Sequence, residues 1–297
     1  MASASHKELQ SQCTAFSRSA AWQQAVSVLA RAEALDLQPD AVLCSAAMSG
    51  CSRASEWAHA LALWEASSFA RNVVVYNGAL AACDKGRKWQ LALHLLEDMP
   101  RSRLEPSVVS YGSTMSACEK CQRWQQTLAL LQQLPHAKLQ PSMVVLNTAI
   151  TASGRQWQLA LSFLREADVL SLRPTVVSLS SALRALADHW QHALCLYEEM
   201  SLRVQPNVIV FNALIAGQPW FAALALLFEL VQKKYPIDEV TVTAALGACE
   251  SGLQWERGLA LLTDMPRWKL RRDLVAFNAA LAALAAGRRL DLAKESL

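Results

Sequence analysis

The sequence predicts an all-α fold, a right-handed superhelical solenoid of tandem helix-turn-helix repeats, each about 31 to 35 residues long. Three observations predict it: a tryptophan that recurs at a near-constant interval, two helical patterns within each interval, and a proline-containing segment between intervals. A fixed period of this length indicates stacked repeats, because one helix pair cannot bury its own apolar face.

Tryptophan is the clearest marker of the period. Eight tryptophans are separated by 35, 32, 35, 33, 33, 30 and 35 residues, and most precede a run such as "WQLALHLLEDM". They are Trp22, Trp57, Trp89, Trp124, Trp157, Trp190, Trp220 and Trp255. Because the series follows the period of the core, we expect these side chains to pack between helices and not to form a ligand cage.

An aliphatic pair, often preceded by proline and a polar residue as in "EPSVV" and "QPNVI", marks the start of each unit. We expect one continuous array over residues 1–297. Its units lie near 6–40, 41–72, 73–107, 108–142, 143–175, 176–207, 208–238, 239–273 and 274–297, the last of them partial.

Each unit contains two amphipathic patterns. In the first, apolar residues recur at i, i+3, i+4 and i+7, which places them on one face of a helix. Examples are Tyr76/Ala79/Leu80/Cys83, Tyr111/Thr114/Met115/Cys118, Phe211/Leu214/Ile215/Gln218 and Val242/Ala245/Leu246/Cys249. The second pattern carries Trp89, Ala92, Leu95, Leu96 and Met99, and proline ends or follows it, as at Pro100, Pro135 and Pro266.

Composition restricts the class of protein. No apolar run approaches the roughly 18 to 20 residues that span a bilayer, so no membrane segment is expected. A net charge of +3 permits an anionic partner without requiring one. Cys51, Cys83, Cys118 and Cys249 fall at the eleventh position of their units. We expect them to be small buried hydrophobes in a reducing compartment.

Two families share this helix-pair architecture. The tetratricopeptide repeat places tryptophan early in its first helix. Here tryptophan opens the second helix, the first begins with Val-Val-x-Tyr-Asn, and proline with a polar residue closes the unit. This arrangement resembles the pentatricopeptide repeat family of RNA-binding proteins over nearly the whole chain. The resemblance is most specific in units 73–107, 108–142 and 239–273, which have the family's 35-residue length.

One stripe of the first helix lies opposite the core and is a candidate binding surface. Its second residue is aliphatic in every unit from 41–72 onward: Val42, Val74, Val109, Val144, Val177, Ile209, Val240 and Val275. These side chains are candidates for sandwiching a base. The thirteenth residue is a cation in the first five units and a candidate for phosphate: Arg18, Arg53, Lys85, Lys120 and Arg155. The alternatives are packing between units for the aliphatic residues and simple solvation for the cations.

The fifth and last residues of each unit are candidates for base reading. In the family they jointly choose the base. The pairs that carry over are Ser45/Asn72, Asn77/Ser107, Asn147/Thr175, Ser180/Asn207, Asn212/Asp238 and Thr243/Asp273. Gln10/Asp40 and Gly112/Ser142 depart from the family's pattern and are not interpreted. Every last residue is also a good helix N-cap, and capping alone explains its presence.

The resemblance, with the parallel orientation of the family, implies a single-stranded target near 5′-A-Y-N-Y-A-U-G-3′. Side-chain chemistry supports the rule, because ionised Asp only accepts hydrogen bonds and suits the imino N–H of uracil or guanine. Adenine and cytosine present a ring acceptor at that place, which needs a donor such as an Asn amide or a hydroxyl. The last three bases are the best supported.

No active site is expected. Cys118 and Cys121 form a lone CxxC, whereas structural zinc needs about four ligands. The deaminase signature HxE with PCxxC is absent from the C-terminal part of the sequence, and no Gly-rich phosphate loop occurs. We therefore expect no enzyme, no cofactor, no metal and no small-molecule substrate.

The sequence thus predicts a sequence-specific single-stranded RNA-binding protein, acting in organellar RNA processing, stability, editing or translation, with other RNA-processing proteins as further partners. Family resemblance implies a chloroplast or a mitochondrion, although the N-terminus shows no clear transit peptide. Two alternatives stay open: a protein-binding scaffold that uses the same surface, and a decayed or fragmentary array that binds nothing tightly.

Overall fold

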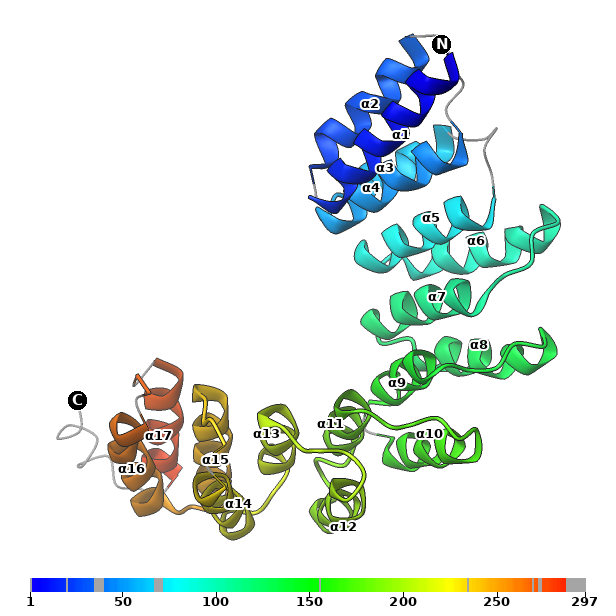
Figure 1. The fold of residues 1–297 in the computed structure, drawn as a ribbon. Helices are drawn as coiled ribbons and strands as arrows, with labels where there is room; N and C mark the ends of the chain where they lie inside the picture. Colours follow the sequence, from blue (N-terminus) through cyan, green and yellow to red (C-terminus); the bar gives the residue numbers. More distant parts are fainter. Residues whose placement is uncertain are drawn as a thin grey trace. The chain divides into compact units, whose positions relative to one another are not determined.

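The computed structural model describes residues 2–19, 21–34, 40–66, 72–154, 156–233, 235–268, 270–271 and 274–286. Within these ranges all regular secondary structure is helical, in seventeen α-helices and one short 3₁₀ helix (Figure 1). Contacts divide the chain into two compact units, residues 1–152 and 153–297. The all-α helical-repeat solenoid is confirmed, while the single array stays a prediction.

The first compact unit holds nine helices, which alternate between the first and second helix of each repeat. Their bounds are α1 Ala2–Arg18, α2 Trp22–Ala34, α3 Ala41–Arg53, α4 Trp57–Ala66, α5 Val73–Lys85, α6 Trp89–Arg101, α7 Val108–Lys120, α8 Trp124–His136 and α9 Met143–Ala152.

The second compact unit continues the alternation. Its elements are α10 Trp157–Val169, α11 Val176–Ala185, α12 Trp190–Ser201, α13 Val208–Ala216, α14 Trp220–Gln232, α15 Glu239–Ser251, α16 Trp255–Asp264, the 3₁₀ helix η1 Met265–Trp268 and α17 Leu274–Ala286. Pro266 lies in η1, whereas Pro100 and Pro135 lie inside the last turns of α6 and α8, so the second helix extends slightly past these prolines.

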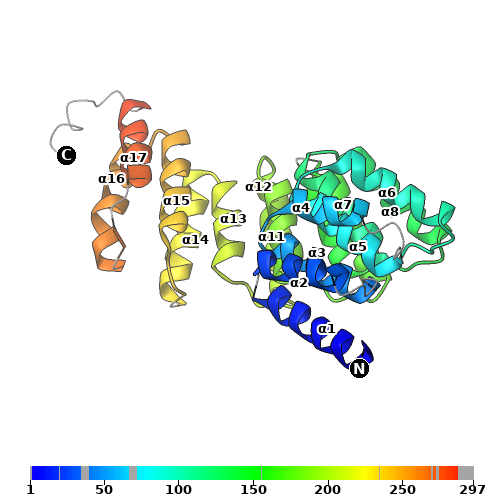
Figure 2. The same cartoon turned by 90° about the horizontal axis from the view of Figure 1, so that it is seen from above.

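Helix packing follows one rule in both units. First helices contact each other in succession, α1 to α3, α5, α7 and α9 in one unit and α11 to α13, α15 and α17 in the other. Most second helices contact the first helix before and the first helix after them, as α4 contacts α3 and α5. Figure 2 shows α13, α15 and α17 side by side in the second unit. Within each compact unit the first helices therefore form a layer that presents one face to solvent.

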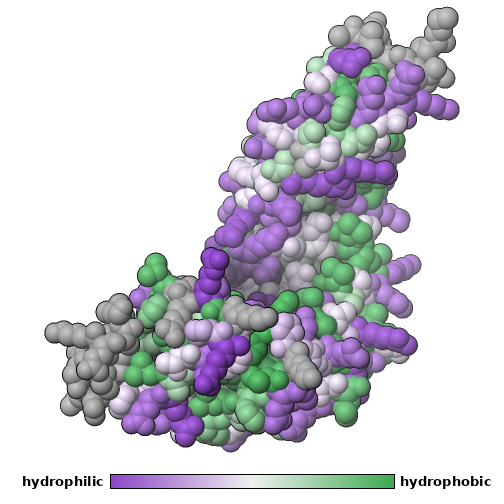
Figure 3. Space-filling model, turned by 60° about the vertical axis from the view of Figure 1, so that its left-hand side comes forward, coloured by the Kyte–Doolittle hydropathy of each residue, from purple (hydrophilic) through white to green (hydrophobic). Residues whose placement is uncertain are grey.

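The core consists of the residues that the 3.6-residue period selects. Tyr76, Ala79, Leu80 and Cys83 are fully buried, and so are their counterparts in α13 and α15 apart from the almost fully buried Leu214 and Gln218. The Tyr76 hydroxyl donates to Asp98 Oδ2 at 2.7 Å, which ties α5 to α6. In Figure 3, patches of hydrophobic and hydrophilic side chains alternate over the face that is shown.

The tryptophans pack between repeats, as their period predicts. Trp57 lies so close to the turn of the following repeat that a Cβ on Gly86 would approach its ring to 2.6 Å. A cation covers the ring from the same turn, with Lys88 Nζ 5.0 Å from the Trp57 centroid. Arg257 covers Trp220 in the same way at 4.8 Å. The tryptophan series thus joins consecutive repeats.

None of the described helices is long and apolar enough to cross a membrane.

Candidate functional site

The second residue of each first helix is exposed wherever its side chain is described. Seven aliphatic side chains are between 50% and 72% accessible to solvent: Val42, Val74, Val109, Val144, Val177, Ile209 and Val240. The following residue, by contrast, is buried, as Val75 is after Val74. Packing between repeats therefore does not account for the aliphatic series. Each of the two compact units presents a row of solvent-facing apolar side chains.

A hollow follows this row across α1, α3 and α5. It encloses about 430 Å³. Its lining combines the exposed Val42 and Val74 with the polar fifth residues Ser45 and Asn77. Arg18 and Arg53 lie at the cationic end of the same lining. The structure thus brings all three kinds of predicted side chain around one surface of the first unit.

The fifth and last residues of one repeat meet directly in the second unit. Asn212 Nδ2 lies 3.1 Å from Asp238 Oδ1 and 3.3 Å from Oδ2. Thr241, one helical turn into α15, donates its hydroxyl within this pair, with Oγ1 2.6 Å from Asn212 Oδ1 and 2.7 Å from Asp238 Oδ1. Two residues that are 26 positions apart in sequence form one polar cluster.

A similar cluster forms in the first unit. Ser110 Oγ donates to Asn77 Oδ1 at 2.7 Å and lies 3.1 Å from Ser107 Oγ. The backbone N–H of Ser107 donates to Ser110 Oγ at 3.1 Å. Asn77 and Ser107 therefore meet through the hydroxyl of Ser110.

Where the fifth residue is Ser or Thr, its hydroxyl bonds to its own helix. Ser45 and Ser180 donate to the carbonyl three residues earlier, and Thr243 to the carbonyl four residues earlier, at 2.7 to 3.1 Å. Ser180 is also 5% exposed. With its proton engaged by the helix, such a hydroxyl presents lone pairs to solvent, so it acts as an acceptor.

The last residues cap the helices that follow, as their residue types predict. Asp40, Asn72, Asn207 and Asp238 each accept the backbone N–H three residues later through Oδ1, at 2.8 to 3.1 Å. Ser107, Ser142 and Thr175 do the same with their hydroxyls. Capping engages one oxygen of each side chain, so Asn72 and Asn207 keep their amide Nδ2 as a donor.

Asp238 carries a charge stabilised by these contacts. Burial by itself would raise the pKa of its carboxyl group. The hydrogen bonds from the Thr241 hydroxyl, the Thr241 amide and the Asn212 amide outweigh burial and lower the pKa below its ordinary value. The side chain is therefore ionised at neutral pH and acts only as an acceptor.

The cations of the thirteenth position differ in their surroundings. Lys120 Nζ pairs with Asp84 Oδ2 at 2.7 Å, and Arg53 Nη1 donates to the Ser17 carbonyl at 3.0 Å. Arg18 and Lys85 are exposed. All four lie in the last turn of their helices, where a positive charge also interacts favourably with the helix dipole. Arg18 and Lys85 keep their charge fully available.

Three predicted site positions lie outside this description. Arg155 and Asp273 are outside the described residues, as is the side chain of Val275. Asn147 belongs to the first compact unit and Thr175 to the second.

Gln10 and the third residue of a repeat also contribute to the site, although neither was among the predicted site residues. Gln10, left without interpretation, donates from Nε2 to Asp40 Oδ2 at 2.6 Å and repeats the Asn212/Asp238 pairing. The third residue of a repeat, represented by Ser110 and Thr241, also belongs to the polar clusters. The signal that was present is a polar residue at a position that is otherwise apolar.

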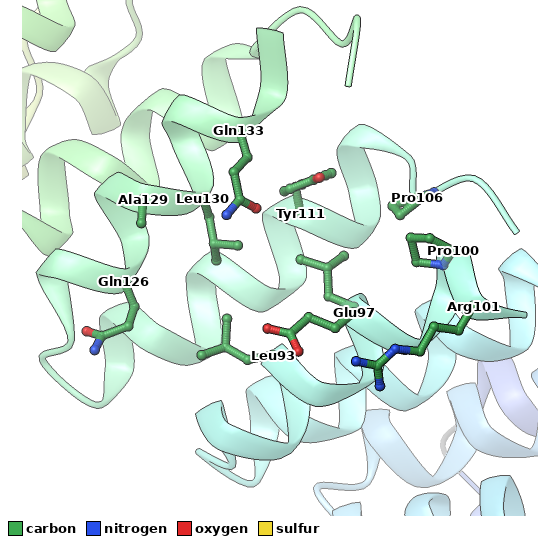
Figure 4. A pocket seen from close by; sticks show the side chains of 11 residues that line it. Leu93, Glu97, Pro100, Arg101, Pro106, Tyr111, Gln126, Ala129, Leu130 and Gln133 are labelled. Atoms are coloured by element: carbon green, nitrogen blue, oxygen red, sulfur yellow. The ribbon is translucent and has the colours of Figure 1, made fainter. Parts of the chain in front are cut away.

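A larger cavity of about 550 Å³ lies beside the second helices α6 and α8 (Figure 4). Glu97 and Arg101 reach it from α6 and Gln133 from α8, and Tyr111 closes one side. Its lining contains none of the predicted site residues. Among the described residues, no three His, Cys, Asp or Glu side chains come together in a way that would hold a metal ion. Cys121 Sγ, of the CxxC, donates instead to the Arg87 carbonyl at 3.2 Å.

The fold defines a helical-repeat protein whose first helices present exposed aliphatic side chains, with polar clusters beside them at Asn77 and Asn212. Residues 62–120 match the sequence profile of the pentatricopeptide repeat domain. Over these residues the chain matches the family that its sequence resembles. No curated protein sequence matches it.

Several solved structures share the fold of this chain. The chain superposes on PPR10 in complex with an 18-nt psaJ RNA element with a TM-score of 0.80, at 16% identity, over 92% of this chain and 41% of that one. PPR10 from maize alone gives 0.53 at 19% identity, over 95% and 47%. The PPR domain of Arabidopsis thaliana protein-only RNase P 1 in complex with tRNA gives 0.50 at 14% identity, over 57% and 94%. The chain thus spans less than half the length of the PPR10 chains.

Proposed function

We propose that this protein binds single-stranded RNA and distinguishes its bases one repeat at a time. The observation that carries the proposal is the hydrogen-bonded pair of a fifth and a last residue, seen in Asn212 and Asp238, beside an exposed aliphatic side chain. Neither the exposure of the aliphatic residue nor the pairing of the polar ones is needed to stack the helices. Together they offer a flat apolar contact for a base and hydrogen-bonding groups for its edge.

In this proposal the fifth and last residues of each repeat read the base, and the aliphatic second residues sandwich it. Arg18 and Lys85 contact phosphate most directly, because Lys120 is already paired with Asp84. The proposed target is 5′-A-Y-N-Y-A-U-G-3′, read by both compact units as one array. The solved relatives that bind RNA support binding in general.

The role proposed is binding, without catalysis by this chain. A bound protein can block nucleases, open a hairpin or recruit RNA-processing proteins, and so affect processing, stability, editing or translation of its transcript. The compartment proposed is a chloroplast or a mitochondrion, by analogy with the family.

Fluorescence anisotropy of the full chain with a labelled AYNYAUG RNA tests the proposal. A scrambled RNA and a salt series serve as controls. We expect tighter binding to the target than to the scramble, and weaker binding by the Asn212→Ala variant. Glu198→Ala changes an exposed residue of the second helix α12 and should bind as the unmodified protein does.

Two results would count against the proposal. Equal binding to both RNAs with a steep salt slope would leave only attraction of phosphate by a basic surface. No binding at moderate salt would exclude RNA as the ligand and favour a protein partner on the same surface.

A further inference from the structure

Where the fifth residue of a repeat is asparagine and another repeat follows, the third residue of that next repeat carries a hydroxyl group. The pairs are Asn77 with Ser110, Asn147 with Ser178, and Asn212 with Thr241. Where the fifth residue is not asparagine, the third residue of the next repeat is apolar. Those pairs are Gln10 with Leu43, Ser45 with Val75, Gly112 with Val145, Ser180 with Val210, and Thr243 with Ala276.

Ser110 and Ser178 complete capping boxes, in which their hydroxyls accept the backbone N–H of the N-cap residue. The Thr241 hydroxyl makes no such bond to its N-cap backbone, so helix capping does not account for it. Ser110, Ser178 and Thr241 are fully buried, and so are Val75 and Val210 at the same position. Valine has nearly the shape of threonine, and buried valine avoids the cost of placing a hydroxyl away from water. A polar residue at this position therefore needs a reason other than packing.

The contacts of Thr241 supply that reason. Its hydroxyl is 2.6 Å from Asn212 Oδ1 and 2.7 Å from Asp238 Oδ1. Ser110 contacts Asn77 Oδ1 at 2.7 Å in the same manner. In both clusters the buried hydroxyl reaches the oxygen of the asparagine amide.

The partners fix which way the Asn212 amide points. The carboxylate of Asp238 only accepts hydrogen bonds, so the amide atom that faces it must be the nitrogen. The oxygen then faces Thr241 and accepts its proton. If the amide were flipped, its oxygen would face the carboxylate with no proton between the two acceptors, and the hydrogen bond from Thr241 to that oxygen would be lost.

We propose that the third-position hydroxyl is a positioning residue for base recognition, which holds the preceding asparagine so that it presents only an N–H donor to the base. This inference rests on the proposed function. Beside the ring nitrogen that the last residue meets, uracil and cytosine carry a carbonyl that accepts such a donor, whereas adenine carries only a C–H there. A fixed donor therefore favours pyrimidines over adenine, and repeats with Ser at the fifth position need no such hydroxyl because the Ser hydroxyl bonds to its own helix.

The test compares Thr241→Val, Thr241→Ser and the unmodified protein. The RNAs are AYNYAUG and the same RNA with adenine in place of its uracil. We expect Thr241→Val to lower the preference for uracil about threefold to tenfold, in keeping with the net contribution of one hydrogen bond. Thr241→Ser keeps the hydroxyl and should restore the preference.

Thr127→Val is the matched control. Thr127 is also fully buried, but it lies in the second helix α8 and donates to the Arg123 carbonyl. This variant undergoes the same chemical change away from the polar cluster, and should keep the preference for uracil. Unchanged discrimination by Thr241→Val, or an equal loss in Thr127→Val, would overturn the inference.

A measurement without RNA separates this inference from the proposed function. In NMR spectra of the free protein, Thr241→Val should shift the side-chain amide signals of Asn212 and raise the pKa of Asp238 toward its ordinary value. If the unmodified protein bound no RNA, the proposed function would fail and base recognition with it. Unmoved Asn212 and Asp238 signals would refute positioning by Thr241 even in a protein that binds RNA well.

Discussion

The side chain of Asn212 donates to the carboxylate of Asp238 across 26 residues of sequence, from the fifth residue of α13 to the N-cap of α15. The cap uses Asp238 Oδ1 for the Thr241 backbone N–H, so one side chain both starts a helix and faces its neighbour. Recognition and helix capping are therefore compatible in the same residue, although capping alone explained its residue type.

Asp238→Asn should move the base preference of this repeat from uracil to cytosine. Asparagine caps a helix about as well as aspartate, so stability should change little. Its cap uses Oδ1, as in Asn72 and Asn207, and leaves an amide donor for the ring nitrogen of cytosine. Anisotropy with RNAs that carry U or C at this position measures the change, which we expect to be about tenfold, equivalent to about 1.4 kcal/mol.

Asp40→Asn provides the control for that experiment. Asp40 caps α3 with the same geometry, in the other compact unit. It should leave the choice between these two RNAs unchanged. A uracil preference that survives Asp238→Asn would show that the last residue does not read this base.

Val74→Ala should weaken RNA binding, whereas Val75→Ala should lower the stability of the fold, although the two residues are adjacent. Val74 is exposed, so its truncation should change the free energy of unfolding by less than about 0.5 kcal/mol while weakening RNA binding. Val75 is fully buried, so its truncation should lower the free energy of unfolding by about 1–3 kcal/mol. Urea denaturation and anisotropy on both variants check this. A strongly destabilising Val74→Ala would mean that this side chain packs in the core.

Gly252→Ala should destabilise the protein because a Cβ there would approach the Trp220 ring to 2.3 Å. We expect a loss of about 1–3 kcal/mol from overpacking at the junction of two repeats. Gly247→Ala is the matched control, since its Cβ would enter open space within the same helix region. There the higher helix propensity of alanine should stabilise by up to about 1 kcal/mol. Chemical denaturation should thus rank the two variants on opposite sides of the unmodified protein.

The buried cysteines should make stability fall at high pH. Burial raises the pKa of the Cys83 thiol to about 12 and of Cys118 to about 11. The unfolded chain loses these protons near the ordinary pKa of about 9, so above that pH the unfolded state binds fewer protons and becomes favoured. The stabilisation is complete below pH 9 and declines up to about pH 12. Urea denaturation between pH 8 and 11 measures it.

Thiol labelling offers a direct check on the same cysteines. Cys195 is exposed and should react in the native state, whereas Cys83 and Cys118 should react only on unfolding. Rapid native labelling of Cys83 would contradict its burial.

The core of this fold could be predicted from sequence because it follows one period. Tyr76, Leu80 and Cys83 are buried where the i, i+4, i+7 spacing places them. Val74 is informative for the same reason, since an aliphatic residue on the opposite face had no place in the core. Position along a single helix was enough for both conclusions.

The polar clusters could not be predicted because they join residues of consecutive repeats. Thr241 belongs to one helix and Asn212 to the preceding first helix, so no pattern within a helix relates them. The same holds for Lys120, whose partner Asp84 is 36 residues away. Helical periodicity specifies which face a residue occupies, and the register between two packed helices comes only from the structure.

The pairing of first helices has a consequence for engineering. Because Asn212 lies on α13 while Asp238 and Thr241 lie at the start of α15, the segment that must be moved intact does not coincide with one sequence repeat. A graft cut at the aliphatic pair would separate Thr241 from Asn212 and join it to an unrelated fifth residue. Exchange cassettes cut after the third residue of each repeat would instead carry the asparagine, its carboxylate partner and the hydroxyl between them as a single transferable piece.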